Sequence, residues 1–520
     1  MCPAILQNTT TLEQFDRHFK MTSPIRDLTN VQGDILLNGL SKEVETFWFF
    51  SIPDGQVSNF CTNLRQVAQQ EITSTENMRT TRKNIKDWRK DPATSGMMAV
   101  VGANVSFTFK GLQKVGRSFL ADKCDADSDQ MSAKLKVLQL NTGDSVFEQG
   151  MRSDSTRALE DPVKPNTSDP DWDAEWLSNS LDGVLSVAGS DFQTVQDKIN
   201  RITNLFGSSI KLAFKIDGNT RPGQFRGKEH FGYQDGISQP VVKDLPDLTK
   251  EEAFVPPGQD IIDQGTILCG RPGDIKAQNR PAWMLDGSFL VFRKLKQNVQ
   301  DWDKFLVDSS NTLGTWPDQL GARLIGRWKS GCPVNLQAEW DDTNIGKDPM
   351  RNNLFEYDPP GLNSQFVDVN KAGSRIICPI GAHIRKTNPR GDQPSRGRVD
   401  VNPHRILRRG IPYGPEKDVS PNAERGLLFA CYQSSIEQGF HFIQTAWANS
   451  PFFRFSGAGV DAVMGQQNNP GTIGMKGLFP QDASRELQLP AVNRFVVPRG
   501  GEYFFTPSIS ALTGVLSSVK

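Results

Sequence analysis

The chain has 520 residues, and its 59 Lys and Arg balance 59 Asp and Glu, so the formal net charge is zero. This length is enough for a large core and normally divides into two or more domains. The charge balance argues against nucleic acid or an anionic membrane surface as a partner, and no apolar run is long enough to cross a bilayer.

Residues 1–29 form a polar N-terminal tail that contains Asp, Glu and Lys. The tail lacks the apolar core of a secretory signal. We therefore expect a cytoplasmic protein or one secreted by a non-classical route. An extracellular protein whose leader had been removed would give the same sequence, so that alternative stays open.

The first half of the chain combines apolar strands with amphipathic helices. We expect a strand at 46–52 followed by a helix at 56–70, and later a helix at 192–206 followed by a strand at 210–216. Residues 241–281 are rich in Pro and Gly and are expected to form a connection rather than core.

The second half repeats this pattern. A strand is expected at 288–295 with a helix at 298–307, and a strand at 427–431 with a helix at 437–447. Two similar halves of this kind predict an α+β fold, with each sheet backed by helices. We place the N-terminal domain at 30–280 and the C-terminal domain at 281–520.

The segment from Gly232 to Gly236 reads Gly-Tyr-Gln-Asp-Gly and sets one carboxylate, Asp235, between two glycines. Glycine adopts backbone conformations that are closed to other residues, and it lets the main chain approach a ligand closely. Asp-Gly is also among the commonest turn dipeptides. By itself, the segment is therefore compatible with either a functional site or a surface turn.

Candidates for metal ligands are few in this chain. The seven cysteines are scattered without a C-x-x-C pair, which argues against a disulfide framework or a zinc site. There are only five histidines, so each can be considered singly: His18, His230, His383, His404 and His441. Residue pattern alone does not choose among them, because a lone histidine is more often structural than a ligand.

Three segments, in this order, resemble the dye-decolorizing peroxidases, a family of haem enzymes. Gly232 to Gly236 matches the family motif G-x-x-D-G, residues 378–390 resemble its proximal-histidine segment, and residues 406–415 resemble the segment with its distal arginine. Residues 30–36 resemble the start of the family domain. The resemblance therefore runs from about residue 30 to the C-terminus.

The resemblance implies two ferredoxin-like domains, each an antiparallel β-sheet packed with helices, and one haem b per chain bound in the second domain. It implies that His383 is the axial ligand of the haem iron. The small neighbours Gly381 and Ala382 are expected to let a flat macrocycle approach. A carboxylate or carbonyl should accept the other ring hydrogen of His383, but spacing does not identify it.

On the opposite face of the haem, the resemblance implies that Asp235 transfers a proton between the two oxygens of hydrogen peroxide. Arg408 would stabilise the charge that develops as the O–O bond breaks. Arg409 is the competitor for this position, and a pair of arginines is otherwise typical of a solvated face or a propionate clamp. An aspartate base, with a reference pKa of about 3.9, predicts activity that is best below about pH 5.

Other residues are expected to border the haem. Gly232 and Gly236 would let the main chain approach it. Arg385 would pair with a haem propionate, or else form a surface salt bridge. Leu427 and Phe429 alternate along a predicted strand and would form an apolar wall of the pocket, although core packing predicts the same alternation.

Bulky dyes cannot enter a pocket built for peroxide, so their electrons must travel through side chains from the surface. Tyr413 and Trp447 are the relay candidates that the resemblance suggests, with ordinary packing as the alternative. The expected partners are hydrogen peroxide and aromatic compounds or dyes, with no nucleic acid and no membrane. A homo-oligomer is also expected, because the family often self-associates.

Three functions remain in competition. The leading one is a haem peroxidase that oxidises dyes and phenols by one-electron steps. The second is a haem-binding or haem-carrier protein on the same scaffold, which would not need both Asp235 and a distal arginine. The third is a non-haem enzyme such as a hydrolase, but the chain has no nucleophile elbow, phosphate loop or two-histidine metal motif.

Overall fold

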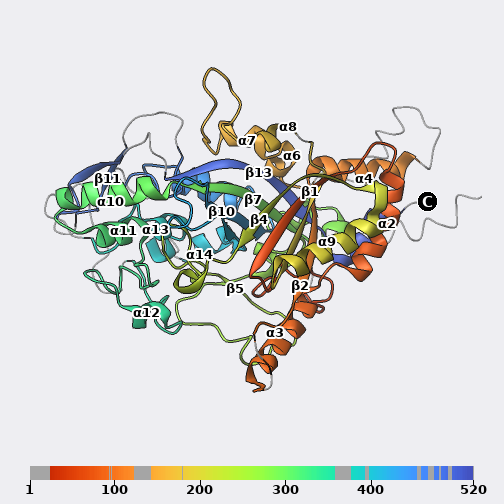
Figure 1. The fold of residues 1–520 in the computed structure, drawn as a ribbon, viewed down its shortest axis with the longest axis horizontal. Coiled ribbons are helices and arrows are strands. Elements are labelled where there is room, and N and C mark those ends of the chain that lie inside the picture. Colours follow the sequence, from red (N-terminus) through yellow and green to blue (C-terminus); the bar gives the residue numbers. More distant parts are fainter. Residues whose placement is uncertain are drawn as a thin grey trace, which may run out of the picture.

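The computed structural model describes residues 24–92, 94, 96–121, 142–178, 180–357, 376–392, 398–453, 458–466, 473–479, 482–489 and 495–518. The N-terminal half of the described chain (red to yellow) and the C-terminal half (green to blue) lie side by side (Figure 1). The C-terminal helix α16, Ile509–Thr513, returns to the N-terminal half and packs against α2, Val57–Gln70.

The N-terminal half contains a four-stranded antiparallel sheet with the order β4-β1-β3-β2. Its strands are β1 Val44–Ser51, β2 Val101–Phe107, β3 Gly183–Gly189 and β4 Lys211–Asn219. Helix α2 follows β1, and helix α9, Phe192–Phe206, connects β3 to β4. This is the ferredoxin-like arrangement, and all four elements that the sequence predicted here are present.

The helices of this half bury the apolar faces that the sequence predicted. In α2, Phe60, Leu64 and Val67 are fully buried at spacings of four and three residues. Phe60 stacks on Phe206 of α9, with ring centroids 4.8 Å apart. Asp191 caps the N-terminus of α9, because its carboxylate accepts the Thr194 N–H at 2.8 Å.

The C-terminal half repeats this topology. Its sheet has the order β13-β7-β10 and ends in β8 and β9, which pair with successive parts of β10. These strands are β7 Ser288–Gln297, β8 Leu407–Arg408, β9 Ile411–Tyr413, β10 Gly426–Gln433 and β13 Val496–Thr506. The predicted helix after β7 is α10, Val299–Leu313, and the one after β10 is α15, Phe440–Phe442, which continues as a π-helix over Ile443–Ala448.

The two sheets join into one barrel-like body. Strand β13 pairs with β2 at Phe505 and Phe107. At the other edges, β4 contacts β9. Phe47 of β1 and Phe292 of β7 meet in the interior, with ring centroids 4.6 Å apart. The predicted α+β class with two antiparallel, helix-packed sheets is confirmed.

Further helices and strands lie in the connections between the main strands. They are α3 Thr75–Lys90, α4 Phe109–Ala121, α6 Ser145–Gln149, α7 Met151–Arg157, α8 Ala174–Ser178, α11 Pro317–Ile325, α12 Thr343–Lys347, α13 His383–Thr387, α14 Arg398–Val401, β11 Ile473–Lys476 and β12 Glu486–Leu489. Between β4 and β7, the predicted connection has only β5 Val241–Val242, β6 Ile261–Ile262 and short turns. The domain boundary at 280 falls in this connection and stays a prediction.

The described helices include none with the length and apolar character that crossing a bilayer requires.

Candidate active site

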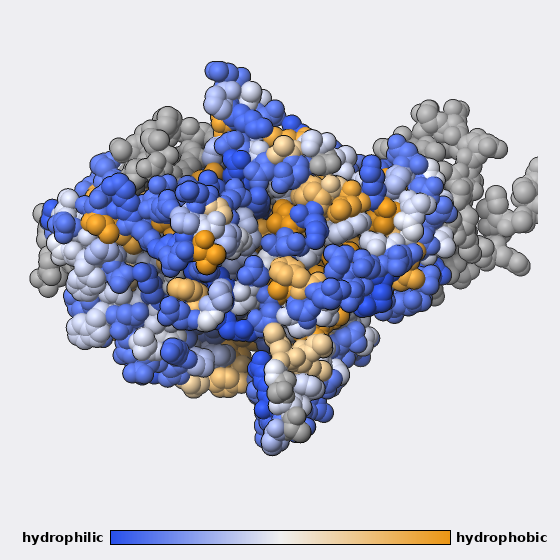
Figure 2. All heavy atoms as spheres, viewed as in Figure 1, coloured by the Kyte–Doolittle hydropathy of each residue, from blue (hydrophilic) through white to orange (hydrophobic). Residues whose placement is uncertain are grey.

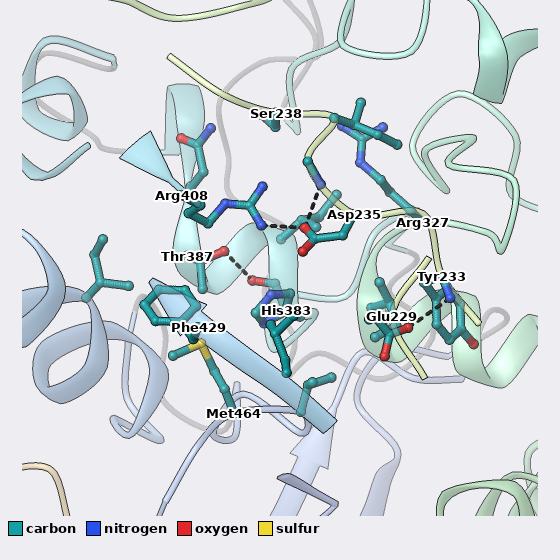
Figure 3. A pocket seen from close by; sticks show the side chains of 18 of the residues that line it. Glu229, Tyr233, Asp235, Ser238, Arg327, His383, Thr387, Arg408, Phe429 and Met464 are labelled. Atoms are coloured by element: carbon teal, nitrogen blue, oxygen red, sulfur yellow. Dashed lines mark hydrogen bonds and ion pairs between the residues drawn. The ribbon is translucent and has the colours of Figure 1, made fainter. Parts of the chain in front are cut away.

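One large cavity brings together the three segments that the sequence singled out. It lies between the loop that carries Asp235, helix α13 with His383, and strands β8 and β10 (Figure 3). Its empty volume is about 1460 Å³, including the part that is open to solvent.

Two left-handed glycines set the position of Asp235. Gly232 has φ of 96° and Gly236 has φ of 77°, a region that side-chain-bearing residues rarely adopt. The Gly236 N–H donates to Asp235 Oδ1 at 2.6 Å, and the Asp235 N–H donates to the Gly227 carbonyl at 3.0 Å. Gly236 lines the cavity, whereas Gly232 does not. The segment is therefore a tight turn that holds its carboxylate in the cavity.

Arg408 and Asp235 meet across this space. Arg408 Nη1 donates to Asp235 Oδ1 at 2.5 Å (Figure 3). Gln239 fixes the Arg408 main chain, because its side-chain amide donates to the Arg408 carbonyl at 2.9 Å and accepts the Arg408 N–H at 3.2 Å. The guanidinium is thus aimed at the carboxylate by both its own ion pair and its strand.

Arg409 points away from the cavity. Successive side chains of a strand point to opposite faces, and the Arg409 guanidinium donates instead to the carbonyls of Asp34, Ile35 and Leu37 at 2.7–3.1 Å. Of the two adjacent arginines, only Arg408 faces Asp235.

The ion pair decides the charge state of Asp235. Burial acts to raise the pKa of this carboxyl, but the Arg408 guanidinium and the Gly236 N–H together hold the pKa below its usual value. The Asp235 side chain is 38% exposed and lines the open cavity. Asp235 is therefore an ionised base that a small molecule in the cavity can reach.

His383 projects from the first turn of α13 and lines the same cavity. Its Nδ1 lies 2.8 Å from Oδ2 of Asp461, a carboxylate that is buried. Oδ1 of Asp461 accepts the N–H groups of Val463 and Met464 at 2.8 and 3.1 Å. Asp461 therefore fixes the ring and its tautomer, which leaves Nε2 as the nitrogen that can bind a metal.

The Asp461 carboxylate also makes the His383 ring more basic. Burial acts to lower the pKa of His383, but the charge of Asp461 and its hydrogen bond outweigh this and raise the pKa above its usual value. The described residues contain no group of three or more His, Cys, Asp or Glu suited to a bare metal ion. A metal held by His383 would therefore need most of its ligands from a macrocycle.

Apolar side chains line much of the remaining wall. Leu427 and Phe429 of β10 both lie in the lining, where the sequence predicted a pocket wall. Phe429 is drawn in Figure 3. Leu428, between them, is fully buried on the opposite face of the strand and belongs to the barrel core. The other apolar lining residues include Ile237, Leu295, Ile325, Phe440, Ile443, Met464 and Val496.

Two buried arginines stand at another part of the lining. The Arg327 guanidinium donates to the Asn352 carbonyl at 2.6 Å and to Asn353 Oδ1 at 2.7 Å, and Arg390 shares that amide oxygen at 3.0 Å. Burial and the nearby Arg390 lower the pKa of Arg327 to about 9. In the described part of the chain, no carboxylate lies within 4 Å of Arg327. Carboxylates of a bound porphyrin would supply the missing charge.

Arg385 does not take the place that the sequence expected. It is buried outside the cavity lining, where its Nε and Nη2 donate to the two oxygens of Asp392 at 2.6 and 2.9 Å. Its Nη1 donates to the Cys378 carbonyl at 2.6 Å. The ion pair is therefore internal rather than a surface salt bridge, and it ties α13 to the turn that follows it, where Asp392 lies.

The small residues before His383 also have a different role from the expected one. A Cβ on Gly381 would lie 2.0 Å from Met475 Cε and 2.7 Å from the Ala458 carbonyl oxygen. Gly381 and Ala382 are both absent from the cavity lining. They allow α13 to pack closely against the core rather than giving a macrocycle room.

Tyr413 and Trp447 are buried, with 7% and 2% exposure, and neither lines the cavity. The Tyr413 hydroxyl donates to Glu424 Oε1 at 3.1 Å. Trp447 stacks on Phe453 with centroids 5.3 Å apart and packs with Ile443, which does line the cavity. Both residues therefore pack as ordinary buried side chains would, which was the alternative to a relay. Their role in electron transfer stays a prediction.

Sequence reasoning missed a second carboxylate in the cavity lining, Glu229. Its oxygens accept the N–H groups of Phe231 and Tyr233, both at 2.8 Å, so it braces the loop that leads to Asp235. Burial raises the pKa of Glu229 above its usual value. The sequence signal was only its position, three residues before Gly232, and that position did not distinguish it from a surface acid.

Comparison with known proteins identifies the same two halves. The family model described as "DyP dimeric alpha+beta barrel domain" matches residues 30–222, and the model "Dyp-type peroxidase, C-terminal" matches residues 271–451. The chain is 36% identical to dye-decolorizing peroxidase msp1 of Mycetinis scorodonius, over 94% of this chain and 88% of the relative. It is 33% identical to dye-decolorizing peroxidase AauDyP1 of Auricularia auricula-judae, over 99% of this chain and 92% of the relative.

Solved structures agree. An ancestral D-type dye-decolorizing peroxidase superposes with a TM-score of 0.80 at 40% identity, covering 95% of this chain and all of the other. A dye-decolorizing peroxidase in complex with 2,6-dimethoxyphenol superposes with a TM-score of 0.74 at 34% identity, with the same coverage.

Proposed function

The chain belongs to the dye-decolorizing peroxidase family and is a peroxidase oxidoreductase, and we propose that it reduces hydrogen peroxide at a haem b held by His383. The observation that carries this proposal is the shared cavity, in which His383 and the Asp235–Arg408 pair both line the wall. We propose one haem per chain, because His383 and the Asp235–Arg408 pair line the same cavity. We place the haem-ligating histidine in the second domain.

The residues that would hold the haem fit its chemistry. His383 Nε2 would bind the iron, the apolar lining that includes Leu427 and Phe429 would contact the ring, and Arg327 would pair with a propionate. When bound, the haem would supply the iron at which the peroxide O–O bond is cleaved. It would also accept the electrons that aromatic substrates give up one at a time.

Asp235 supplies the acid–base chemistry. Its carboxylate, ionised at working pH because Arg408 lowers its pKa, accepts a proton from one oxygen of hydrogen peroxide. The same carboxyl then returns the proton to the other oxygen, which leaves as water. The left-handed turn at Gly236 holds the carboxylate in place for both transfers.

Arg408 and Asp461 each contribute electrostatically, one near the peroxide and the other at His383. The Arg408 guanidinium is a fixed cation that stabilises the negative charge that develops on the departing oxygen. On the other side, Asp461 accepts the Nδ1 hydrogen of His383 and increases the electron donation available at Nε2. Neither residue needs to move a proton.

The substrates we propose are dyes, phenols and other aromatic compounds. A relative has been solved in complex with 2,6-dimethoxyphenol, and this chain has the same fold. Substrates too large for the cavity would be oxidised through side chains, with Tyr413 and Trp447 as relay candidates because Trp447 packs on a residue of the cavity wall. A haem carrier is the alternative function, and it would have no use for the Asp235–Arg408 pair.

The test is a comparison of His383→Ala with His404→Ala, a second histidine that is not in the cavity lining. The wild type and His404→Ala should bind haem with an imidazole-type absorption spectrum and oxidise 2,6-dimethoxyphenol only when peroxide is added. His383→Ala should lose both properties. Haem binding by the wild type without peroxide-dependent oxidation would favour the carrier, and a normal spectrum in His383→Ala would refute the proposed ligand.

A further inference from the structure

A second cavity lies between the C-terminal half of α3 and the neighbouring N-terminal sheet, away from the active site. Helix α3 projects from the body of the molecule, and hydrophilic and apolar atoms lie side by side where it joins the body (Figures 1 and 2). The cavity has an empty volume of about 1320 Å³, including the part open to solvent, and shares no lining residue with the active site. We call it the α3 cavity.

The α3 cavity is lined mainly by positively charged side chains. Its lining contains five cationic side chains and one carboxylate, which are Lys42, Arg82, Lys86, Arg89, Arg226 and Glu43. Arg82, Ile85, Lys86 and Arg89 follow one another at spacings of three, one and three residues, which puts them on one face of α3. The cavity is therefore built along the inner face of this helix.

Three of the five cations already have carboxylate partners. Lys42 pairs with Glu45 at 2.6 Å, Lys86 pairs with Glu251 at 2.5 Å, and Arg226 pairs with Glu43. Lys42 also donates to the Arg409 carbonyl at 2.6 Å, so its ammonium already has two partners within the protein.

Arg82 and Arg89 have no carboxylate within 4 Å in the described part of the chain. Arg82 is half-buried, and one of its five N–H groups donates to the Gly39 carbonyl at 2.5 Å. Burial, followed by repulsion from Arg409, lowers the pKa of Arg82 to about 10. A half-buried guanidinium in this position is stabilised by any anion that enters the cavity.

The remaining wall is apolar. Trp88 and Ile85 come from α3, and Met97 and Met98 come from the segment that follows it. Met97 is 57% exposed, so its side chain is accessible to a ligand that enters the cavity. Sulfur and indole surfaces of this kind pack well against aromatic rings.

We propose that the α3 cavity binds a small aromatic anion, such as an aromatic carboxylate or sulfonate, at a site separate from the haem pocket. The anionic group is bound by Arg82 and Arg89, and the ring lies against Trp88, Ile85 and Met97. Arginine suits this role because its planar fork matches the oxygens of a carboxylate or sulfonate. A neutral aromatic compound lacks the group that these cations recognise.

The test uses the haem-loaded full-length protein and naphthalene-2-sulfonate as the probe, with binding measured by isothermal titration calorimetry. We expect one binding site whose affinity falls about tenfold in Arg82→Gln and in Arg89→Gln, a loss of about 1.4 kcal/mol each. Lys83→Gln is the matched control, since it removes a charge from the same helix outside the cavity lining. Its affinity should equal that of the wild type.

Three results would overturn the proposal: no measurable binding at millimolar probe, equal affinity in all four proteins, or equal affinity for neutral naphthalene-2-methanol. The Soret band is recorded in parallel. A probe that perturbs the Soret band and binds equally well to Arg82→Gln occupies the haem pocket instead. Arg89 is exposed, so Arg89→Gln gives a folded variant even if Arg82→Gln proves unstable.

Discussion

Replacing Arg408 with Gln should move the acid limit of the peroxide reaction to higher pH. Asp235 must be ionised to accept a proton, and Arg408 is the cation that lowers the pKa of Asp235. A carboxyl whose pKa is lowered stays charged further into acid, and activity is lost only as the pH falls through that lowered pKa. Removing the cation leaves burial, which acts to raise the pKa of Asp235, so protonation occurs at a higher pH.

The size of the shift follows from the geometry. Arg408 Nη1 lies 2.5 Å from Asp235 Oδ1, and an opposite charge this close lowers a carboxyl pKa by about 1–3 units. The Asp235 side chain is 38% exposed, so solvent screens part of the attraction. We therefore expect the lower end of the range, about one pH unit, which corresponds to about 1.4 kcal/mol.

The assay is the second-order rate constant for the Soret change after mixing haem-loaded enzyme with peroxide, measured between pH 3 and pH 8. This constant reports the protonation state of the free enzyme. Wild type and the charge-conserving Arg408→Lys should lose activity at the same acid pH, and Arg408→Gln should lose it about one pH unit higher. An acid limb at the same pH in all three proteins would refute the assignment of Asp235 as the base that Arg408 controls.

Further predictions concern haem retention and dye oxidation. Asp461→Asn should weaken haem binding about 10–100-fold, because the His383 ring loses its carboxylate acceptor; haem titration of the apoprotein measures this, and unchanged affinity would contradict it. Arg327→Gln should release haem faster to an acceptor apoprotein, whereas Arg323→Gln, a buried arginine that also donates to carbonyls but lies outside the cavity lining, should not. Tyr413→Phe and Trp447→Phe should slow dye turnover more than 2,6-dimethoxyphenol turnover, and an equal loss on both substrates, or none, would discard the relay.

The sequence predicted the parts of the fold that have a clear local pattern. Helix α9 occupies the predicted range 192–206, and strand β1 lies within two residues of its predicted bounds. Strands β2 and β3 were not identified, because they are short, buried runs with Gly and Ser and lack alternation. Strand β13 contains Pro498, Gly500 and Gly501 and a register shift, features that read as a break in a strand.

Active-site residues could be predicted from the sequence only where they lie in a recognisable motif. Asp235, Arg408 and His383 were identified from segments that resemble the family, and the structure places all three in one cavity lining. Asp461, the partner of His383, lies 78 residues away along the chain, and no local spacing connects the two. Arg385 was expected at a propionate or in a surface salt bridge, whereas it pairs internally with Asp392 in the turn after α13, and no local pattern indicates that pairing.

The central claim is tested most directly by the reaction of haem-loaded Asp235→Asn with peroxide. Asn keeps the shape of the side chain but cannot accept a proton, and loss of a general base typically costs about 10²–10⁴-fold in rate. We predict an unchanged resting spectrum and haem content, with a Soret response to peroxide that is slower by at least about 100-fold. A response as fast as that of the wild type, in a protein with its full haem content, would contradict the account.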